Sequence, residues 1–284
     1  MTATLMDGRS LAAKVRGEVA DAVDKLGSLR LATVLVGDDP ASHLYISRKH
    51  EAAGAVGIEP LDHRLPATVP AADVLELISG LNADDSVDGI LVQAPLPPHL
   101  DEAAAVAAVD PVKDVDGFHP TNAGLLYLGR NAHVPATPLG VMRLLREYRV
   151  PVAGARAVVV GRSPIVGKPM AMLLLQANAT VTLCHSRTEE LERHTLDADV
   201  VVAAAGIPGL ISPDMVKQGA AVVDVGQNRT EAGLVGDVDP GAADVAAYLT
   251  PVPGGVGPMT VAMLLANTVR AAEYRRGLLA FPVL

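Results

Sequence analysis

Short apolar runs alternate with longer amphipathic stretches along the first half of the chain. Residues 31–36 (Leu-Ala-Thr-Val-Leu-Val) form an apolar run, and residues 42–56 follow with the spacing of a helix. A strand over 58–65, a helix over 71–81 and a strand over 89–92 come next. Continuous apolar strands separated by helices are typical of a parallel sheet covered on both faces.

The same pattern starts again after a predicted helix over 139–148. The second series has a strand over 156–160, a helix over 168–178, strands over 179–183, 199–203 and 220–225, and a last helix over 259–276. We therefore predict an α/β protein of two three-layer lobes with parallel sheets, divided into domains 1–140 and 141–263. The C-terminal segment 264–284 is expected to complete the first domain.

Composition narrows the class of protein. The 284 residues are 50% hydrophobic and 19% charged, with a formal net charge of −9, which is typical of a globular chain and unfavourable for binding a phosphate backbone. No apolar segment reaches the roughly 18 residues of a membrane-spanning helix, and the start of the chain lacks the pattern of a signal peptide. One cysteine, Cys184, excludes an intrachain disulfide and fits a reducing cytoplasm. We predict a cytoplasmic protein without nucleic-acid or membrane partners.

A glycine turn follows the predicted strand 156–160. The segment Gly161-Arg-Ser-Pro-Ile-Val-Gly167 leads into a helix, which is a physical arrangement for holding a pyrophosphate. The phosphate-binding loop of NTPases is excluded because five residues separate the glycines and Pro169 follows Lys168. The dinucleotide fingerprint also fails, since Ser163 occupies its second glycine position. An ordinary tight turn remains the alternative.

The next predicted strand ends without the carboxylate that holds the ribose 2′-hydroxyl of NAD. Ser186 and Arg187 stand there instead, and Arg162 in the glycine turn adds a second cation. Hydroxyl and guanidinium groups suit a 2′-phosphate, because arginine offers two donors to phosphate oxygens. The pattern favours NADP over NAD.

Candidate chemistry in the first lobe lies on one helix and at strand ends. Tyr45 and Lys49 are four residues apart and so share a helix face, although a surface Tyr lying along a Lys stem is the plainer interpretation. Short-chain dehydrogenases use such a pair, but they place the nucleotide fold before it. Gln93 follows one strand, and Asp114 and Asp116 precede a glycine turn; loop hydrogen bonding and turn capping remain alternatives for them.

Six motifs stand in an order that resembles one family. They are Tyr45-Ile-Ser-Arg-Lys49, Asp88-Gly-Ile-Leu-Val-Gln93, Lys113-Asp-Val-Asp-Gly-Phe-His-Pro120, Gly161-Arg-Ser-Pro-Ile-Val-Gly-Lys-Pro169, Cys184-His-Ser-Arg-Thr188 and Thr250-Pro-Val-Pro-Gly-Gly-Val-Gly-Pro-Met-Thr260. The chain resembles the bifunctional methylenetetrahydrofolate dehydrogenase/methenyltetrahydrofolate cyclohydrolases of the FolD type over nearly its whole length. Ala136 and Gln227 depart from the residues usual in the family, Cys and Ile, and the second change affects an expected nucleotide contact.

The resemblance implies an NADP-dependent oxidation of 5,10-methylenetetrahydrofolate followed by hydrolysis to 10-formyltetrahydrofolate. Lys49, Gln93 and Asp116 are then the expected catalytic residues: Lys49 transfers the proton, Gln93 is its hydrogen-bonding partner, and Asp116 anchors the pterin. The expected folate-binding residues are Tyr45, Pro253, Gly254 and Gly255, and the expected cofactor-binding residues are Gly161, Arg162, Ser163, Ser186, Arg187 and Gln227. The resemblance also implies an active site in the cleft between the two lobes.

Three other functions stay open at this stage: a dehydrogenase without the hydrolytic activity, a non-catalytic folate- or nucleotide-binding protein, and a general hydroxy- or amino-acid dehydrogenase. The sequence contains no His–Asp pair in a suitable motif that would support the hydroxy- or amino-acid dehydrogenase. The eight histidines form no ligand set, so no metal is predicted. A homodimer is expected from the family alone, as is a place in one-carbon metabolism serving purine, methionine and histidine biosynthesis.

Overall fold

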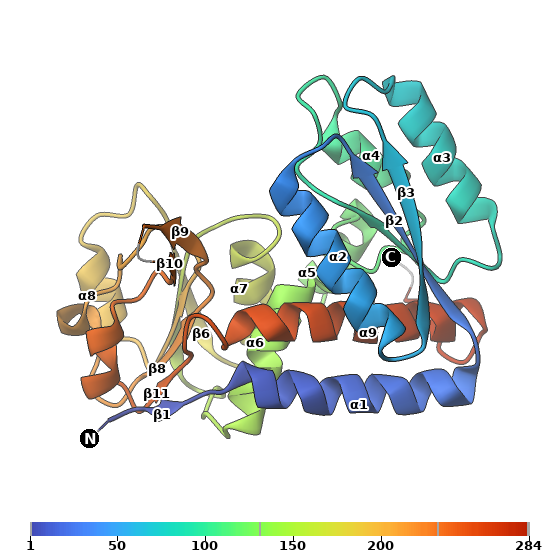
Figure 1. Ribbon diagram of the computed structural model, residues 1–284. Coiled ribbons are helices and arrows are strands. Elements are labelled where there is room, and N and C mark those ends of the chain that lie inside the picture. The colour runs from blue at the N-terminus through green and yellow to red at the C-terminus, as the bar shows by residue number, and fades with distance from the viewer. Residues whose placement is uncertain (1, 131, 232, 283–284) are drawn as a thin grey trace. The chain divides into compact units, whose positions relative to one another are not determined.

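The computed structural model describes residues 2–130, 132–231 and 233–282, and Figure 1 shows their secondary structure. The chain divides into two compact units. Unit 1 contains Pro135–Thr260 together with the chain up to Ala13, and unit 2 contains Lys14–Val134 together with the chain from Val261. Two helices, α1 (Gly8–Leu26) and α9 (Val256–Arg275), each contain one of the unit boundaries.

Unit 2 is built on a three-stranded sheet. Its elements, besides its parts of α1 and α9, are β2 (Leu29–Val36), α2 (Pro40–Gly54), β3 (Ile58–Leu65), α3 (Ala71–Ala83), β4 (Gly89–Val92), α4 (Glu102–Ala108) and α5 (Pro120–Tyr127). The strand order is β3-β2-β4 and both pairs are parallel, with Leu31 of β2 opposite Gly89 of β4. Parallel pairing requires the helical crossovers that the sequence pattern predicted.

The two faces of β2 are covered by different helices, because successive side chains of a strand point to opposite faces. Ala32, Val34 and Val36 belong to an apolar cluster with residues of α3 and α4. On the other face, Thr33 is buried and its Oγ1 lies 2.8 Å from Nε2 of His50 on α2. Helices on both faces make unit 2 a three-layer structure.

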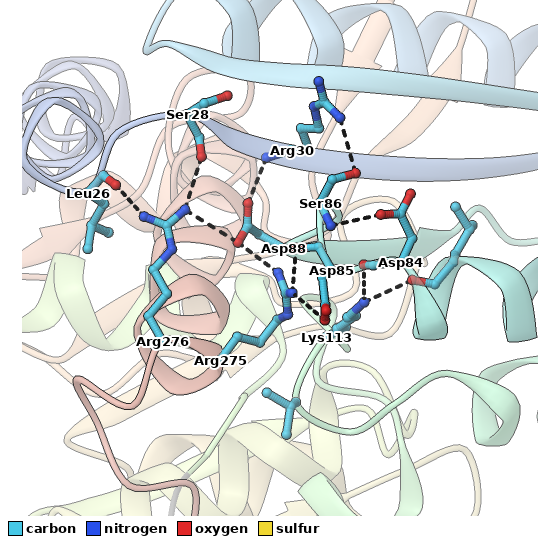
Figure 2. Close-up of polar contacts among 12 residues, drawn as sticks. Leu26, Ser28, Arg30, Asp84, Asp85, Ser86, Asp88, Lys113, Arg275 and Arg276 are labelled. Atoms are coloured by element: carbon cyan, nitrogen blue, oxygen red, sulfur yellow. Dashed lines mark hydrogen bonds and ion pairs between the residues drawn. The ribbon is translucent and has the colours of Figure 1, made fainter.

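A buried ion-pair network joins the end of α9 to the sheet of unit 2, as Figure 2 shows. Asp88 immediately precedes β4 and accepts a hydrogen bond from the Arg30 backbone N–H at 2.9 Å. Its other oxygen lies 3.0 Å from Nη1 of Arg275. The side chains of Arg275 and Asp88 are only 15% and 4% exposed. Arg276 donates to the carbonyl oxygens of Leu26 and Ser28.

Lys113 makes a second buried polar contact in unit 2. Its ammonium donates to three carbonyl oxygens at the end of α3, those of Leu81, Asn82 and Asp84, at 2.8–2.9 Å. The last carbonyls of a helix have no partner within the helix, and a cation there satisfies them. Lys113 therefore fixes the chain that leads into residues 114–119.

Unit 1 is built on a six-stranded parallel sheet of order β1-β11-β8-β7-β5-β6. Its strands are β1 (Thr4–Leu5), β5 (Arg156–Val160), β6 (Thr180–Cys184), β7 (Val200–Ala203), β8 (Ala221–Asp224) and β11 (Tyr248–Leu249). A separate antiparallel pair is formed by β9 (Asn228–Thr230) and β10 (Gly233–Val235). The helices are α6 (Ala136–Glu147), α7 (Gly167–Gln176) and α8 (Leu191–Leu196), with 3₁₀ turns at Pro213–Met215 and Pro240–Asp244.

The predicted α/β fold with parallel sheets and two domains is confirmed. The division of the chain differs at its ends: the prediction placed residues 1–140 in one domain, whereas the first 13 residues and 135–140 belong to unit 1. The first residues do so because β1 pairs with β11. The prediction contained no helix before residue 31 and so missed α1. Among the described residues, no helix combines the length and apolar character needed to cross a membrane.

Removing the Asp88 carboxylate is expected to destabilise the protein. Asp88→Ala leaves the largely buried Arg275 guanidinium without its buried charged partner, and among the described residues only the fully exposed Asp85 carboxylate remains, 3.5 Å from Nη2, so we expect a loss of about 3 kcal/mol in the free energy of unfolding. Glu59→Ala is the matched control in the same unit, since the Arg30–Glu59 pair is 39% and 52% exposed and contributes less than about 1 kcal/mol. Urea denaturation measures both; equal losses would contradict the importance of the network.

Candidate active site and nucleotide-binding cavity

Lys49 lies on α2 and points its ammonium at the end of β4. The helix is started by Asp39, whose carboxylate accepts a hydrogen bond from Ser42 N at 2.8 Å, and Pro40 occupies the first turn. Lys49 Nζ donates to Gln93 Oε1 at 3.0 Å. The Gln93 amide is oriented for this contact because its Nε2 donates to the carbonyl of Ala94 at 2.6 Å.

Asp116 is held in a turn that Asp114 organises. The buried Asp114 carboxylate accepts hydrogen bonds from Gly117 N at 3.1 Å, His119 N at 2.8 Å and Asn122 Nδ2 at 2.8 Å. Asp114 also forms a parallel bridge with Ile90 of β4, the strand that Gln93 follows. The turn therefore belongs to the same sheet edge as Gln93.

Burial perturbs both charged groups of this site. It lowers the pKa of Lys49, and the nearby Asp116 carboxylate only partly opposes this change. Burial also raises the pKa of Asp116 to about 6, against the opposing effect of Lys49, while Asp114 adds to the increase. Such perturbed pairs are typical of catalytic sites, because an amine with a lowered pKa is more often neutral near pH 7 and can accept a proton.

The structure therefore brings together Lys49, Gln93 and Asp116, all within unit 2. Tyr45 lies one helical turn before Lys49 on α2, and it is 42% exposed. The remaining predicted folate-binding residues, Pro253, Gly254 and Gly255, belong to unit 1 and are described there.

The loop after β11 is tightly built around its glycines. Gly254 has φ +117°, which few other residues adopt, and its carbonyl accepts from Gly8 N at 3.0 Å. A Cβ on Gly255 would lie 2.7 Å from the Pro251 carbonyl oxygen, and one on Gly8 would lie 1.7 Å from the Gly255 oxygen. Pro253 follows a cis peptide bond and is exposed. Close backbone contact explains why glycine occupies these positions.

Unit 1 contains a cavity of about 410 Å³ at the carboxyl ends of β5, β6 and β7. Its lining residues are Val160, Gly161, Arg162, Ser163, His185, Ser186, Thr188, Leu191, Ala204, Ala205, Ile207 and Leu210. In the sheet, β5 lies between β6 and β7. The chain goes from β5 to its neighbour β6 and then crosses to β7 on the other side of β5, so the strand order reverses at β5. Doubly wound sheets bind nucleotides at this reversal point.

The glycine turn of the cavity is compact. A Cβ on Gly161 would lie 2.1 Å from the Ala204 carbonyl oxygen, and one on Gly167 would lie 2.0 Å from the Gly161 oxygen. Ser163 Oγ accepts from Val166 N at 3.1 Å at the start of α7. A hydroxyl that accepts this bond can still donate its own proton to an anion. The turn thus presents a donor and a helix N-terminus beside an exposed Arg162.

Four of the six predicted cofactor-binding residues line the cavity, namely Gly161, Arg162, Ser163 and Ser186. Arg187 is exposed next to it, and its backbone N–H donates to His185 Nδ1 at 3.1 Å. Gln227 lies elsewhere in unit 1, where a Cβ on Gly257 would come within 2.7 Å of its Nε2.

The prediction missed the wall of the cavity that follows β7, Ala204 to Ile207. Small apolar residues after a strand are common, so nothing in the sequence indicated that these residues line a cavity. His185 and Thr188 were also missed as lining residues, although both lie in a motif that had been singled out. Among the described residues, no three His, Cys, Asp or Glu side chains are grouped as a metal site.

Known proteins resemble the chain over almost its full length. A family model described as the tetrahydrofolate dehydrogenase/cyclohydrolase catalytic domain matches residues 6–116, and the NAD(P)-binding domain model of the same family matches residues 135–276. The bifunctional protein FolD of Paraburkholderia xenovorans is 54% identical, with 96% of this chain and 98% of that protein covered.

Solved structures agree. The bifunctional FolD dehydrogenase/cyclohydrolase of Campylobacter jejuni superposes with a TM-score of 0.94 at 48% identity, covering 96% of this chain and 99% of that one. The Trypanosoma brucei enzyme, solved with an NADP cofactor and an inhibitor, gives a TM-score of 0.91 at 40% identity, covering 99% and 100% of the two chains.

The fold and the cavity define a two-domain α/β protein with an NAD(P)-binding domain. The chain belongs to the tetrahydrofolate dehydrogenase/cyclohydrolase family, which confirms the resemblance found in its sequence motifs.

The raised pKa of Asp116 predicts a particular pH dependence of stability. The folded protein binds this proton up to about pH 6, whereas the unfolded chain releases it near pH 4, so stability falls as the pH rises between these values. Asp116→Asn removes the titration. We therefore expect the stability of the unsubstituted protein, relative to this variant, to fall by up to about 3 kcal/mol from pH 4 to pH 7.

Urea denaturation at a series of pH values measures the difference. Asp73→Asn, which changes an exposed carboxylate on α3, is the control for the loss of one negative charge. A difference between the unsubstituted protein and Asp116→Asn that stays constant from pH 4 to pH 7 would contradict the burial argument.

Proposed function

We propose that this protein oxidises 5,10-methylenetetrahydrofolate to 5,10-methenyltetrahydrofolate with NADP⁺ and then hydrolyses the product to 10-formyltetrahydrofolate. In the second step water adds to the methenyl carbon, one carbon–nitrogen bond breaks and one proton is released. Membership of the family supports both activities. The observation that carries the proposal is the hydrogen bond from Lys49 to Gln93 beside the Asp116 carboxylate.

Lys49 is proposed to move the proton in the hydrolytic step. Its lowered pKa favours a neutral amine, which does not repel a cationic carbon and can accept a proton from the attacking water. Gln93 accepts the hydrogen bond from Lys49 at 3.0 Å and so holds the amine in one position. An amide suits this role better than a carboxylate, because a negative charge there would raise the pKa of the lysine.

Asp116 is proposed to bind the donor nitrogens of the pterin. Its turn is fixed by Asp114, so the carboxylate is in place before the substrate binds. Tyr45, exposed one turn away on the same helix as Lys49, would stack on the folate ring. Pro253, Gly254 and Gly255 are proposed to bind the substrate as well.

The cavity of unit 1 fits a dinucleotide phosphate. Gly161 and Gly167 allow the backbone of the turn to pack closely where no Cβ could fit, and the helix α7 starts where a pyrophosphate would lie. Ser163 and Arg162 would hold phosphate oxygens, and Ser186 with Arg187 would hold the 2′-phosphate that distinguishes NADP from NAD. Gln227 is proposed as a further contact. When bound, NADP⁺ supplies the acceptor for the hydride that leaves the methylene carbon.

The NADP cofactor in the T. brucei relative supports this choice of nucleotide. We also propose that the protein is a cytoplasmic homodimer that works without a metal ion. Its place would be one-carbon metabolism, which serves purine, methionine and histidine biosynthesis.

A coupled assay tests the proposed function. The protein is given methylenetetrahydrofolate and NADP⁺, NADPH is followed by absorbance, and the conjugated methenyl cation is followed at its own wavelength. We expect NADPH to form and the cation to be consumed. Formation of NADPH with a stable cation would indicate a dehydrogenase alone, and no NADPH would favour a non-catalytic binding protein.

Lys49→Met is expected to separate the two activities. The substitution keeps the length of the side chain but removes the amine, so hydrolysis of the methenyl cation should fall at least 100-fold. The dehydrogenase should fall less than tenfold, because hydride transfer needs no protein base. Arg48→Met, an exposed change on the same helix, is the control. Equal loss of both activities would refute this role for Lys49.

Arg187→Ala is expected to change the choice of cofactor. Loss of the guanidinium should raise the KM for NADP⁺ at least tenfold and leave the KM for NAD⁺ within about twofold, since only NADP⁺ carries the 2′-phosphate. Arg193→Ala is the matched control, because Arg193 is exposed and paired with Glu190. An unchanged preference for NADP⁺ would remove Arg187 from the phosphate site.

A further inference from the structure

Two buried carboxylates lie behind the nucleotide cavity of unit 1, and the proposed chemistry uses neither. Asp224 is the last residue of β8, and Asp237 follows β10 two residues after its end. Both are buried, with 4% and 0% of their surface exposed. A buried carboxylate is costly unless hydrogen bonds compensate it, so the partners of each one indicate what it holds.

Asp237 holds the wall of the cavity that follows β7. One carboxylate oxygen, Oδ2, accepts from Ala205 N at 2.6 Å and from Gly206 N at 2.8 Å. The other, Oδ1, accepts from Ile207 N at 3.0 Å and from Asn228 Nδ2 at 2.8 Å. Three consecutive backbone N–H groups thus converge on one side chain. Ala205 and Ile207 are lining residues of the cavity.

Asp224 in turn holds Asp237. Its carboxylate accepts from Asp237 N at 2.9 Å, from Val238 N at 3.0 Å and from Gly226 N at 2.9 Å. Burial raises the pKa of Asp224 to about 6; the three N–H groups lower it and so favour the ionised form, whereas the charge of Asp237 raises it. The two carboxylates therefore form one connected support.

Two glycines provide the space for this support. A Cβ on Gly226 would lie 2.2 Å from Asp237 Oδ1, and a Cβ on Gly236 would lie 1.7 Å from Asp224 Oδ2. Any side chain at either position would displace a carboxylate. Glycine is therefore required here by close contact with a charged oxygen.

We propose that Asp237 is a positioning residue for the cofactor: its carboxylate fixes the backbone of residues 205–207 in the shape that the nucleotide needs. This inference rests on the proposed binding of NADP⁺ in the cavity. Within the part of the chain that the structure describes, the four hydrogen-bonding partners of Asp237 are all N–H donors, so an amide cannot replace the carboxylate. In Asp237→Asn, the side-chain NH₂ faces at least one of these donors, and the wall of the cavity has to move.

Binding and kinetics of the full-length protein test the proposal. In Asp237→Asn we expect the Kd of NADP⁺, measured by titration calorimetry, and the KM for NADP⁺ to rise at least tenfold. The dehydrogenase kcat should stay within threefold, and hydrolysis of added methenyltetrahydrofolate within twofold. A purely structural defect would instead lower both activities in proportion to the folded fraction.

Asp239→Asn is the matched control. Asp239 is exposed two residues further on and accepts only a local hydrogen bond, from Gly241 N at 2.7 Å, among the contacts of the described residues. The Kd of the Asp239→Asn variant for NADP⁺ should match that of the unsubstituted protein. A Kd of Asp237→Asn within twofold of that value would overturn the proposal.

A milder variant covers the case in which Asp237→Asn does not fold. Asn228→Ala removes one of the four donors and leaves the three backbone contacts, so the Kd of NADP⁺ should rise about threefold; an unchanged Kd would then overturn the proposal. Absence of NADP⁺ binding by the unsubstituted protein would instead overturn the proposed function itself.

Discussion

A lysine ammonium that loses most of its water must find oxygen atoms nearby, and in unit 2 this constraint falls on Lys49. Burial lowers its pKa; its ammonium donates to Gln93, which follows β4, and it interacts electrostatically with Asp116, which lies in a turn further along the chain. These segments meet because Asp114 bridges Ile90 in the sheet. The position of the amine therefore depends on the parallel sheet, and the sheet depends on the helices that cover its faces.

Unit 1 has the opposite requirement, because there it is hydrogen-bond donors that need acceptors. There the groups that need partners are backbone N–H donors after β7, and a buried carboxylate, Asp237, supplies the acceptors. Hydrogen bonds of this kind are strong because one partner is charged, and they hold a loop that has no regular secondary structure. The loop then lines a cavity that the glycine turn at Gly161 lines as well.

Local features of this protein could be predicted from its sequence, and relations between distant segments could not. The strand Arg156–Val160 and the turn after it were recognised because apolar runs and glycines are local signals. The acceptor for Lys49 was found through a family resemblance, since no spacing rule joins residues 49 and 93. Nothing in the sequence indicated the role of Asp237, because that role depends on N–H groups some 30 residues earlier in the chain. The pairing of β1 with β11 joins the two ends of unit 1, and sequence periodicity contains no information about it.

A comparison of two lysines in unit 2 shows why a perturbed pKa alone does not identify a catalytic residue. Burial lowers the pKa of both Lys49 and Lys113. Lys113 donates all three of its hydrogens to carbonyl oxygens, so it must stay protonated to hold them and has no capacity left for chemistry. Lys49 donates one hydrogen bond, to Gln93, within the described part of the chain, and it can lose a proton without breaking a network. What separates the structural lysine from the reactive one is therefore the number of oxygens around each ammonium.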